Sequence, residues 1–485
     1  MNIAYIINAI GRISIVIALF MSTCVLWAIY YSETHVYFPL GISIFISLVL
    51  GIIMVFGTHY SSKNINLKDK YIIVVVSWLF IGVLGALPYY ISGNIPSFID
   101  AMFESLSGFS TTGSTILTDI EALPRSILYW RSLTHWIGGM GIIVLVIAVF
   151  PMFKTIGYQM FSLEASGLLN QKLKPRTSDI AKRLWSIYIG LTVILVGLLM
   201  WGGMDFYESL CHSFGTIATG GFSTKNSSVG FYSPYIQYVI TIFMLLSGMN
   251  FTLHYFLIKG NFKRLYVNSE LRLYLFIIAV VTLIISAVLI VEQNYDTELA
   301  FRESFFQVVS MLTTTGYATT DYLLWPTQAW ILIFGLMFIG GCVGSTAGGV
   351  KVIRHVVAFK YLKKQLSLLV HPNAIKVIKI NQRSVQDNQA ITIIVFIMFY
   401  IIIFAIGVFI MSIMGLDLQT AMGSVISTMG SFGPGIGTVG PAANFAHIPD
   451  VGKIVLTLLM VIGRLEIFTF MIILTPDFWK KQISN

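Results

Sequence analysis

Four short segments rich in threonine, serine and glycine interrupt an otherwise apolar chain of 485 residues. Each contains a central glycine (Gly113, Gly220, Gly316 or Gly433), and successive central glycines are 107, 96 and 117 residues apart. Backbone carbonyls can replace the hydration shell of a cation, and glycine permits the positive φ angles that turn carbonyls inward. Four such loops around one axis would form the walls of a cation pore.

The composition indicates a polytopic membrane protein. The chain is 56% hydrophobic and only 11% charged, whereas soluble proteins carry roughly 25% charged residues. Its mean hydropathy is +0.83. The net charge is +9. The basic residues are distributed as the membrane orientation requires, as described below, so we expect no nucleic-acid partner. Cys24, Cys211 and Cys342 are isolated in or beside apolar segments, which is typical of buried structural thiols.

A membrane-spanning helix needs about 20 mostly apolar residues. Ten segments qualify, at roughly 5–31, 37–59, 71–92, 126–152, 184–202, 233–258, 272–291, 327–350, 389–414 and 451–474. Four amphipathic segments between them are too polar to span: 95–116, 204–224, 298–320 and 416–439. We therefore expect an all-α polytopic membrane protein with ten spanning helices and four re-entrant pore helices.

The order of these segments predicts four pseudo-symmetric repeats of helix, pore loop and helix after a two-helix preface. The preface covers residues 1–66, and the repeats cover 67–160, 161–262, 263–384 and 385–485. An ungapped alignment on the central glycines places Asp100, Tyr207, Glu303 and Thr420 thirteen residues upstream, and Ser107, Phe214, Ser310 and Ser427 six residues upstream. We expect the upstream carboxylates to cap the short helices.

The charges predict the orientation in the membrane. If the N-terminus is cytoplasmic, that side carries 23 of the 30 basic residues and the opposite side carries 14 of the 21 acidic residues. Lys and Arg concentrate on the cytoplasmic side of membrane proteins. Both termini are then cytoplasmic, and all four loops enter from an acidic external face, which attracts cations over about 8 Å.

At these four loops, in this order and over about 400 residues, the chain resembles the Trk/Ktr/HKT superfamily of potassium transporters. The two-helix preface is typical of its TrkH branch. The resemblance implies a pseudo-fourfold pore within one chain, a homodimer in a bacterial inner (plasma) membrane, and a filter with one loop from each repeat. The implied filter residues are Thr111, Thr112, Gly113, Ala218, Thr219, Gly220, Thr314, Thr315, Gly316, Ser431, Phe432 and Gly433.

Two of these positions bear on selectivity and register. Some plant relatives carry serine in place of the first filter glycine and favour sodium, so Gly113 points to potassium as the transported ion. The fourth loop departs from the family pattern, because Phe432 replaces a threonine and Pro434 follows Gly433. Gly435 is therefore a rival for the position assigned to Gly433.

The segment after the third loop predicts a break in a helix. Residues 326–370 contain no strong polar stop before Lys351, and as one helix they would extend roughly 67 Å, about twice a bilayer core. Helix packing by small residues explains the pattern equally well. The resemblance favours an intramembrane loop that obstructs the pore, so we expect a gate formed by Gly340, Gly341, Gly344, Ser345, Thr346, Gly348 and Gly349.

Arg464 is a charged residue roughly 20 Å along the last predicted spanning helix. Charges at such depth are candidates for function. Glu466 is two residues away and so lies on another side of the helix, which makes it a poor partner. We expect Arg464 to act with the gate as a positive barrier or as a donor to loop carbonyls, with a structural role in the bundle as the alternative.

The remaining motifs indicate what the chain lacks. No cytoplasmic loop exceeds roughly 35 residues, which is too short for an ATPase domain. We therefore expect no organic cofactor, with potassium as the transported substrate. The resemblance implies a separate TrkA-like, nucleotide-binding cytoplasmic regulator that docks on the basic stretches 154–183 and 351–383, although anionic membrane lipid explains those stretches equally well.

Two other classes of function remain as alternatives. A membrane-embedded enzyme would need metal or paired-carboxylate motifs, and HExxH and DDxxD are absent from the sequence. His135 and His254 have no paired ligands, so we expect packed core residues. A sodium- or proton-coupled symporter should carry carboxylates at the bilayer midplane, and only Glu466 comes near it. We therefore expect a transporter that is not an enzyme.

Overall fold

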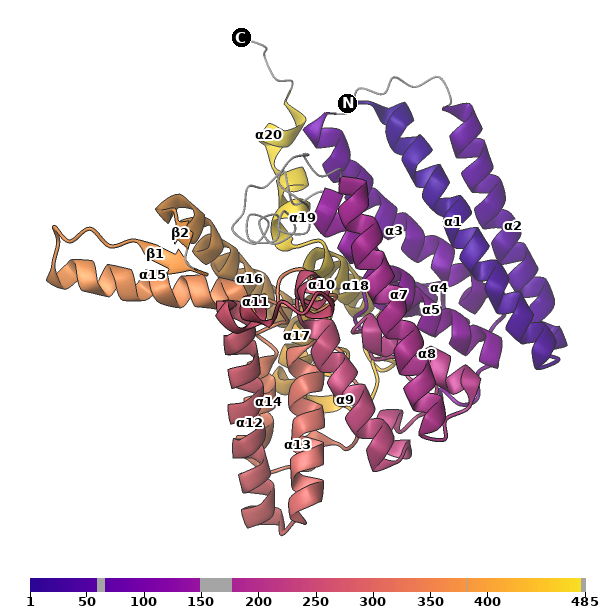
Figure 1. The fold of residues 1–485 in the computed structure, drawn as a ribbon. Coiled ribbons are helices and arrows are strands. Elements are labelled where there is room, and N and C mark those ends of the chain that lie inside the picture. Colours follow the sequence, from indigo (N-terminus) through magenta and orange to yellow (C-terminus); the bar gives the residue numbers. More distant parts are fainter. Residues whose placement is uncertain (59–65, 149–176, 382, 481–485) are drawn as a thin grey trace.

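The computed structural model describes residues 1–58, 66–148, 177–381 and 383–480. Its helices pack side by side in one assembly (Figure 1). The α-helices are α1 (Ile3–Tyr30), α2 (Thr34–Gly57), α3 (Leu67–Ile91), α4 (Phe98–Phe109), α5 (Arg125–Ala148), α7 (Thr177–Trp201), α8 (Phe206–Ile217), α9 (Pro234–Gly248), α10 (Phe251–Ile258), α11 (Phe262–Val267), α12 (Ser269–Gln293), α13 (Thr297–Leu312), α14 (Thr327–Leu336), α15 (Val352–Val370), α16 (Asp387–Ile413), α17 (Leu418–Gly430), α18 (Asp450–Arg464), α19 (Ile467–Leu474) and α20 (Pro476–Trp479). Strands β1 (Ile378–Ile380) and β2 (Arg383–Val385) form an antiparallel hairpin.

The four short helices α4, α8, α13 and α17 occupy the four amphipathic segments. Each follows a long helix and is followed by a polar loop and another helix, which confirms the predicted order. Their N-termini are capped by side chains that accept a backbone N–H in the first turn, from Ser97, Asp205, Asp296 and Asp417.

The aligned carboxylates are not themselves the caps, although Asp100 lies in the first turn as predicted, where its charge complements the helix dipole. Asp100 lies within the first turn of α4 and forms an ion pair with Lys453 of α18 at 2.6 Å. Glu303 lies in the second turn of α13, beyond the backbone N–H groups that need a cap.

The predicted count of ten spanning helices is not confirmed. Among the described residues, six helices are long and apolar enough to cross a membrane, and eight if each of two bent helix pairs counts as one span. The predicted span 126–152 runs past the described residues. The predicted span 327–350 ends as a helix at Leu336, after ten residues.

Two of the predicted spans are sharply bent. The axes of α9 and α10 differ by 105°, and those of α18 and α19 differ by 113°. Asn250 starts α10 by accepting a hydrogen bond from the backbone N–H of Thr252, and Glu466 has a φ of +57° where α18 gives way to α19. The average hydropathy stays high across each bent pair despite the polar residues Asn250, Arg464 and Glu466, so hydropathy alone does not reveal the bends.

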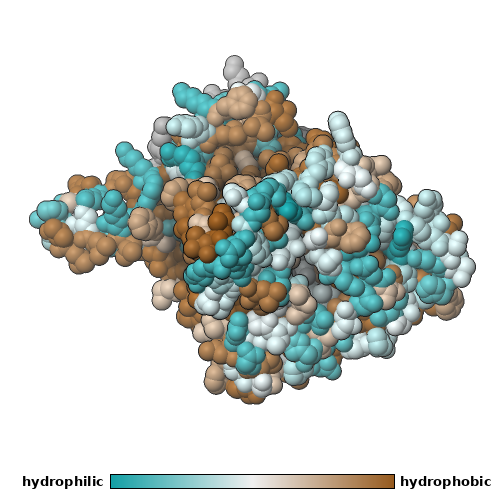
Figure 2. Space-filling model, turned by 90° about the horizontal axis from the view of Figure 1, so that it is seen from below, coloured by the Kyte–Doolittle hydropathy of each residue, from teal (hydrophilic) through white to brown (hydrophobic). Residues whose placement is uncertain are grey.

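The start of α1 and helix α20 lie at the same end of the molecule, at the top of Figure 1. The opposite end, which includes the turn between α12 and α13, is seen in Figure 2, where hydrophilic side chains cover much of the middle of the face. Helix α15 and the β-hairpin project sideways from the body (Figure 1).

Candidate cation pathway

The four polar loops, numbered first to fourth in chain order, contact one another in a closed ring. Each contains one glycine with a φ between +80° and +85°: Gly113, Gly221, Gly316 and Gly433. A Cβ atom at these positions would crowd a carbonyl oxygen of the neighbouring loop: that of Gly220 at Gly113, of Thr315 at Gly221, of Phe432 at Gly316, and of Thr112 at Gly433. Only glycine therefore permits such close approach of the backbones.

The loops also share one backbone conformation. Two residues before each of these glycines stands a residue with left-handed φ between +53° and +59°: Thr111, Thr219, Thr314 and Ser431. The residue between them donates its N–H to a carbonyl five residues earlier, and these pairs are Thr112 with Ser107, Gly220 with Gly215, Thr315 with Ser310, and Phe432 with Ser427. A left-handed φ outside glycine costs about 1–3 kcal/mol and is typical of functional sites.

This geometry corrects the alignment of the second loop by one residue. Gly221 occupies the place predicted for Gly220, and Thr219 occupies the place of Thr111. Ala218 ends α8 in right-handed conformation, as Ser110 ends α4. The Gly-Gly pair at 220–221 made either register compatible with the sequence. In the fourth loop the backbone pattern falls on Gly433, and Gly435 does not share it.

A serine six residues before the glycine supports the outer part of three loops. Ser107 Oγ donates to the carbonyl of Ser114 at 2.6 Å, and Ser310 Oγ donates to that of Tyr317 at 2.7 Å. Ser427 donates to the carbonyl of Gly433.

In the second repeat this serine is replaced by Gly215. The Tyr317 hydroxyl from the third loop lies where a side chain on Gly215 would be, 3.2 Å from the carbonyl oxygen of Phe222. A side chain of the third loop thus supports the second loop in place of the missing serine.

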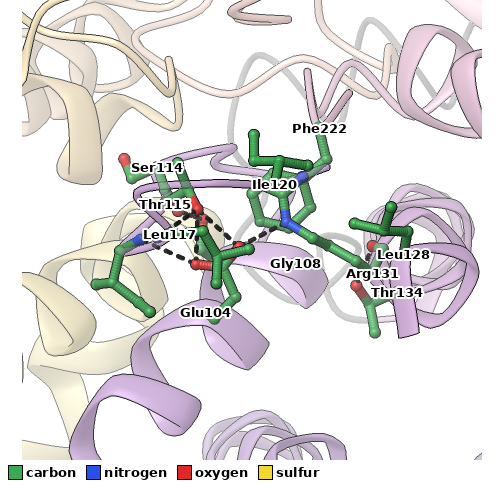
Figure 3. Close-up of polar contacts among 12 residues, drawn as sticks. Glu104, Gly108, Ser114, Thr115, Leu117, Ile120, Leu128, Arg131, Thr134 and Phe222 are labelled. Atoms are coloured by element: carbon green, nitrogen blue, oxygen red, sulfur yellow. Dashed lines mark hydrogen bonds and ion pairs between the residues drawn. The ribbon is translucent and has the colours of Figure 1, made fainter. Parts of the chain in front are cut away.

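A buried ion pair that the sequence reasoning missed lies behind the first two loops (Figure 3). Arg131 Nε of α5 donates to Glu104 Oε1 of α4 at 2.6 Å, and both side chains are at most 2% exposed. Arg131 lies in a helix that we predicted only as a span, and Glu104 was counted only as an external acidic residue. Their pairing joins positions 27 apart in the sequence, and no spacing rule indicates it.

His135 also joins the first two loops. Its Nδ1 lies 2.9 Å from the carbonyl oxygen of Gly108, and its Nε2 accepts the N–H of Phe222 at 3.2 Å. Since Nε2 accepts, Nδ1 carries the proton and donates to Gly108. His135 is fully buried, so the prediction of a packed core residue is confirmed, with a supporting contact to the loops.

The chain leaves α14 after Leu336 and re-enters a helix at Val352, so the predicted break in the 326–370 segment is confirmed and begins at Met337. The loop between them is buried. It is hydrogen-bonded to the bend between α9 and α10, where Cys342 N–H donates to the carbonyl of Gly248 at 2.9 Å and Phe251 N–H donates to that of Gly344 at 3.0 Å.

The same loop contacts the ring itself. Gly348 N–H donates to Thr314 Oγ1 at 2.6 Å, and Thr314 is the left-handed residue of the third polar loop. Thr346 Oγ1 donates to the carbonyl of Ile217 at the end of α8 at 3.0 Å. The residues predicted as a gate therefore lie against the helix ends that carry the polar loops.

Arg464 reaches this loop from the end of α18. Its Nη1 donates to the carbonyl of Thr346 at 2.9 Å and its Nη2 to that of Gly138 at 3.4 Å, and the residue is 2% exposed. Glu466 forms an ion pair with Arg354 of α15, so the expectation that it is a poor partner for Arg464 is confirmed. A cavity of about 30 Å³ lies between Arg464 and the loop residues 343–349, enough space for a water molecule.

Glu270 is a second buried charge that the sequence pattern does not indicate. This buried carboxylate in the first turn of α12 accepts the N–H of Val343 at 2.8 Å and that of Ile353 at 3.2 Å, one on each side of the loop. Glu104 and Glu270 are thus buried, whereas Glu466, the only carboxylate expected at depth, is partly exposed. Glu104 is compensated by Arg131, and Glu270 by two backbone donors.

Comparison with known proteins places these features in one family. The TrkH family model, described as a cation transport protein, matches residues 40–481. The chain is 39% identical to the Trk system potassium uptake protein TrkH of Salmonella typhimurium over 90% of this chain and 91% of that protein. It is 34% identical to TrkH of Halomonas elongata over 99% and 100%. The crystal structure of the potassium transporter TrkH from Vibrio parahaemolyticus superposes with a TM-score of 0.90 at 34% identity, covering 99% of this chain and 100% of that one.

Proposed function

The chain belongs to the TrkH family of cation transport proteins, and from that membership we propose that it takes up potassium selectively across a bacterial inner membrane through a channel-like central pore. The observation that carries the proposal is the closed ring of four polar loops with one repeated backbone conformation. Such a ring can present carbonyl oxygens to a dehydrated cation from four sides. Growth of a bacterium deficient in potassium uptake on low-potassium medium tests it, and failure of the expressed chain to restore growth would contradict it.

The proposed filter follows the observed register. It consists of Thr111, Thr112, Gly113, Thr219, Gly220, Gly221, Thr314, Thr315, Gly316, Ser431, Phe432 and Gly433. Ala218, which the alignment included, is left out because it closes a helix. Glycine at position 113 keeps the backbones of the first two loops close, and we assign potassium selectivity to that close approach.

We propose that the loop 337–351 is the gate and that Arg464 holds it closed. The support is its contact with the third polar loop through Thr314 and its hydrogen bond from Arg464. A buried guanidinium near the path of a cation also raises an electrostatic barrier. Deleting residues 344–348 from a protein that still folds should raise flux, and unchanged flux would remove the gate assignment.

The proposed architecture has ten membrane crossings, four pore helices and cytoplasmic termini. Four units support it, each made of a helix, a short helix, a loop and a further helix. The start of α1 and helix α20 also lie at one end of the molecule (Figure 1). Under this architecture, the chain divides into the preface and the four repeats. Labelling of single introduced cysteines from either side of the membrane tests the count.

We propose two protein partners, a second copy of this chain and a TrkA-like cytoplasmic regulator. The projecting helix α15 supports an intermolecular contact, because Leu362, Leu366 and Leu369 are exposed along it. Of the basic stretches considered as docking sites, 154–176 lies outside the described residues. Light scattering of the purified protein should give twice the 54.1 kDa chain mass, and a monomer would contradict the dimer.

A sodium- or proton-coupled symporter is the second candidate. The buried carboxylates Glu104 and Glu270 are the observation that favours it, because coupled transporters use such groups. Both already have close donors, which argues for fixed structural charges. Rubidium uptake that requires a sodium or proton gradient would support coupling.

A further inference from the structure

A buried ion pair behind the proposed filter joins Glu104 and Arg131 (Figure 3). On the side of the first loop, the Glu104 carboxylate accepts the Thr115 hydroxyl at 2.9 Å and the Ile116 N–H at 3.0 Å. Thr115 and Ile116 follow Gly113 by two and three residues. The carboxylate therefore fixes the outer part of the first filter loop directly.

On the side of the second loop, Arg131 makes two contacts. Its Nη1 donates to the carbonyl of Ser223 at 3.0 Å, and its guanidinium lies 3.4 Å from the centre of the Phe222 ring. Phe222 and Ser223 directly follow Gly221, the second filter glycine. The planar guanidinium can thus bond to Glu104 and Ser223 at once while it stacks on an aromatic face, which a lysine cannot reproduce.

The other three repeats lack this pair. Nine residues before the filter glycine stand Glu104, His212, Gln307 and Ser424, and the seventh residue of the helix after each loop is Arg131, Ile240, Ile333 and Leu456. His212 Nε2 lies 3.0 Å from Ser223 Oγ, which is the uncharged counterpart of the contact between Glu104 and Thr115. The first and second loops are thus joined by charge, whereas the corresponding positions elsewhere are neutral.

We propose that the Glu104–Arg131 pair is a positioning element for ion selectivity. It fixes the outer parts of the first and second loops relative to each other, so that the carbonyl ring keeps the size that favours potassium over sodium. This inference rests on the proposed filter. It assigns part of the discrimination between potassium and sodium to two residues outside that filter. Both side chains act through their contacts with the loops and not by binding the ion.

The test compares variants of the full chain in proteoliposomes, with uptake of rubidium and sodium measured at equal imposed voltage. Glu104→Gln keeps the shape of the side chain but removes the charge, and we expect the rubidium-to-sodium uptake ratio to fall by about tenfold or more, the scale of a lost hydrogen bond to a charged group. The matched control is Asp100→Asn. Asp100 lies on α4, as Glu104 does, and the substitution breaks its ion pair with Lys453 of α18. Among the described residues, the Asp100 side chain pairs with Lys453 and not with a filter loop, so the uptake ratio of Asp100→Asn should stay at the wild-type value.

Two further variants keep the test decisive if Glu104→Gln does not fold. Thr115→Val removes one hydroxyl and leaves the ion pair intact, and it should lower the ratio by about threefold. Arg131→Lys keeps the charge but loses the contact with Ser223, and it should lower the ratio while uptake continues.

The proposal is overturned if folded variants keep the wild-type ratio, or if Asp100→Asn lowers the ratio as much as they do. A wild-type protein that takes up neither ion, or both equally, would instead overturn the proposed function, so the two failures are distinguishable.

Discussion

Arg464 Nη1 donates a hydrogen bond to the carbonyl oxygen of Thr346 at 2.9 Å and so joins the end of α18 to the middle of the loop 337–351. The two residues are 118 positions apart in the sequence. The bend after Arg464, where Glu466 has a positive φ, places the guanidinium at the end of a helix and against the loop. The contact connects α18 to the segment that follows the third polar loop.

Replacing Arg464 with Ala should raise ion flux through the purified protein. The substitution removes both the hydrogen bond that holds the loop and a positive charge beside the cation path, and we expect an increase on the order of tenfold, which corresponds to about 1.4 kcal/mol less repulsion. Rubidium flux into vesicles, normalised to folded protein, measures it. Unchanged flux together with a lower melting temperature would assign Arg464 a structural role only.

Removing the Glu270 carboxylate should have a related effect. Glu270→Ala frees the N–H groups of Val343 and Ile353 on the two sides of the loop, so the closed position loses two hydrogen bonds to a charged acceptor, each about 1.5–3 kcal/mol. We expect higher basal flux than in wild type. Glu292→Ala, on the exposed opposite end of α12, is the control, and equal flux in both variants would refute the role of Glu270.

Gly113→Ser should reduce the preference for potassium over sodium by about tenfold or more. Gly113 has a φ of +84°, and a Cβ there would clash with the carbonyl oxygen of Gly220, so the first two loops must move apart. Gly93→Ser is the matched control, because Gly93 also has a positive φ but has open space around it. An unchanged rubidium-to-sodium flux ratio in Gly113→Ser would remove the filter assignment.

Asp417→Ala should lower stability without changing selectivity. Asp417 caps the short helix α17, and loss of such a cap costs about 1 kcal/mol. Hydrogen bonds from the side chain and backbone of Thr420 lower the pKa of Asp417 below its ordinary value of 3.8. A carboxylate whose pKa is lower in the folded than in the unfolded protein stabilises the fold at pH values above its ordinary pKa. This stabilisation is lost as the pH falls through the pKa of the folded state. The difference in melting temperature between variant and wild type should therefore be present at neutral pH and vanish in strong acid, and a difference that persists there would contradict the cap.

The sequence predicted the repeat and the loops because glycine and hydroxyl residues are distinctive within apolar surroundings. Hydropathy averaged over a spanning length does not reveal a bend, so the breaks at Asn250 and Glu466 were not predicted. Register failed at residues 220–221, where two glycines satisfy the same pattern, and only the φ values distinguish them.

The supporting charges were missed for a different reason. Glu104 meets Arg131, and Glu270 meets Val343, through tertiary packing between separate helices. No spacing along one helix encodes such contacts. A charged residue inside a segment that otherwise reads as apolar, such as Arg131, is the signal that could have revealed the first pair.

Flux into proteoliposomes that contain only the wild-type chain tests the central claim most directly. Rubidium and sodium uptake are measured at a fixed imposed membrane voltage, with and without a proton gradient. The ring of loops predicts rubidium uptake that follows the voltage, exceeds sodium uptake by at least about tenfold and needs no proton gradient. Equal uptake of the two ions, or rubidium uptake only when a proton or sodium gradient is present, would contradict a potassium-selective, channel-like pore.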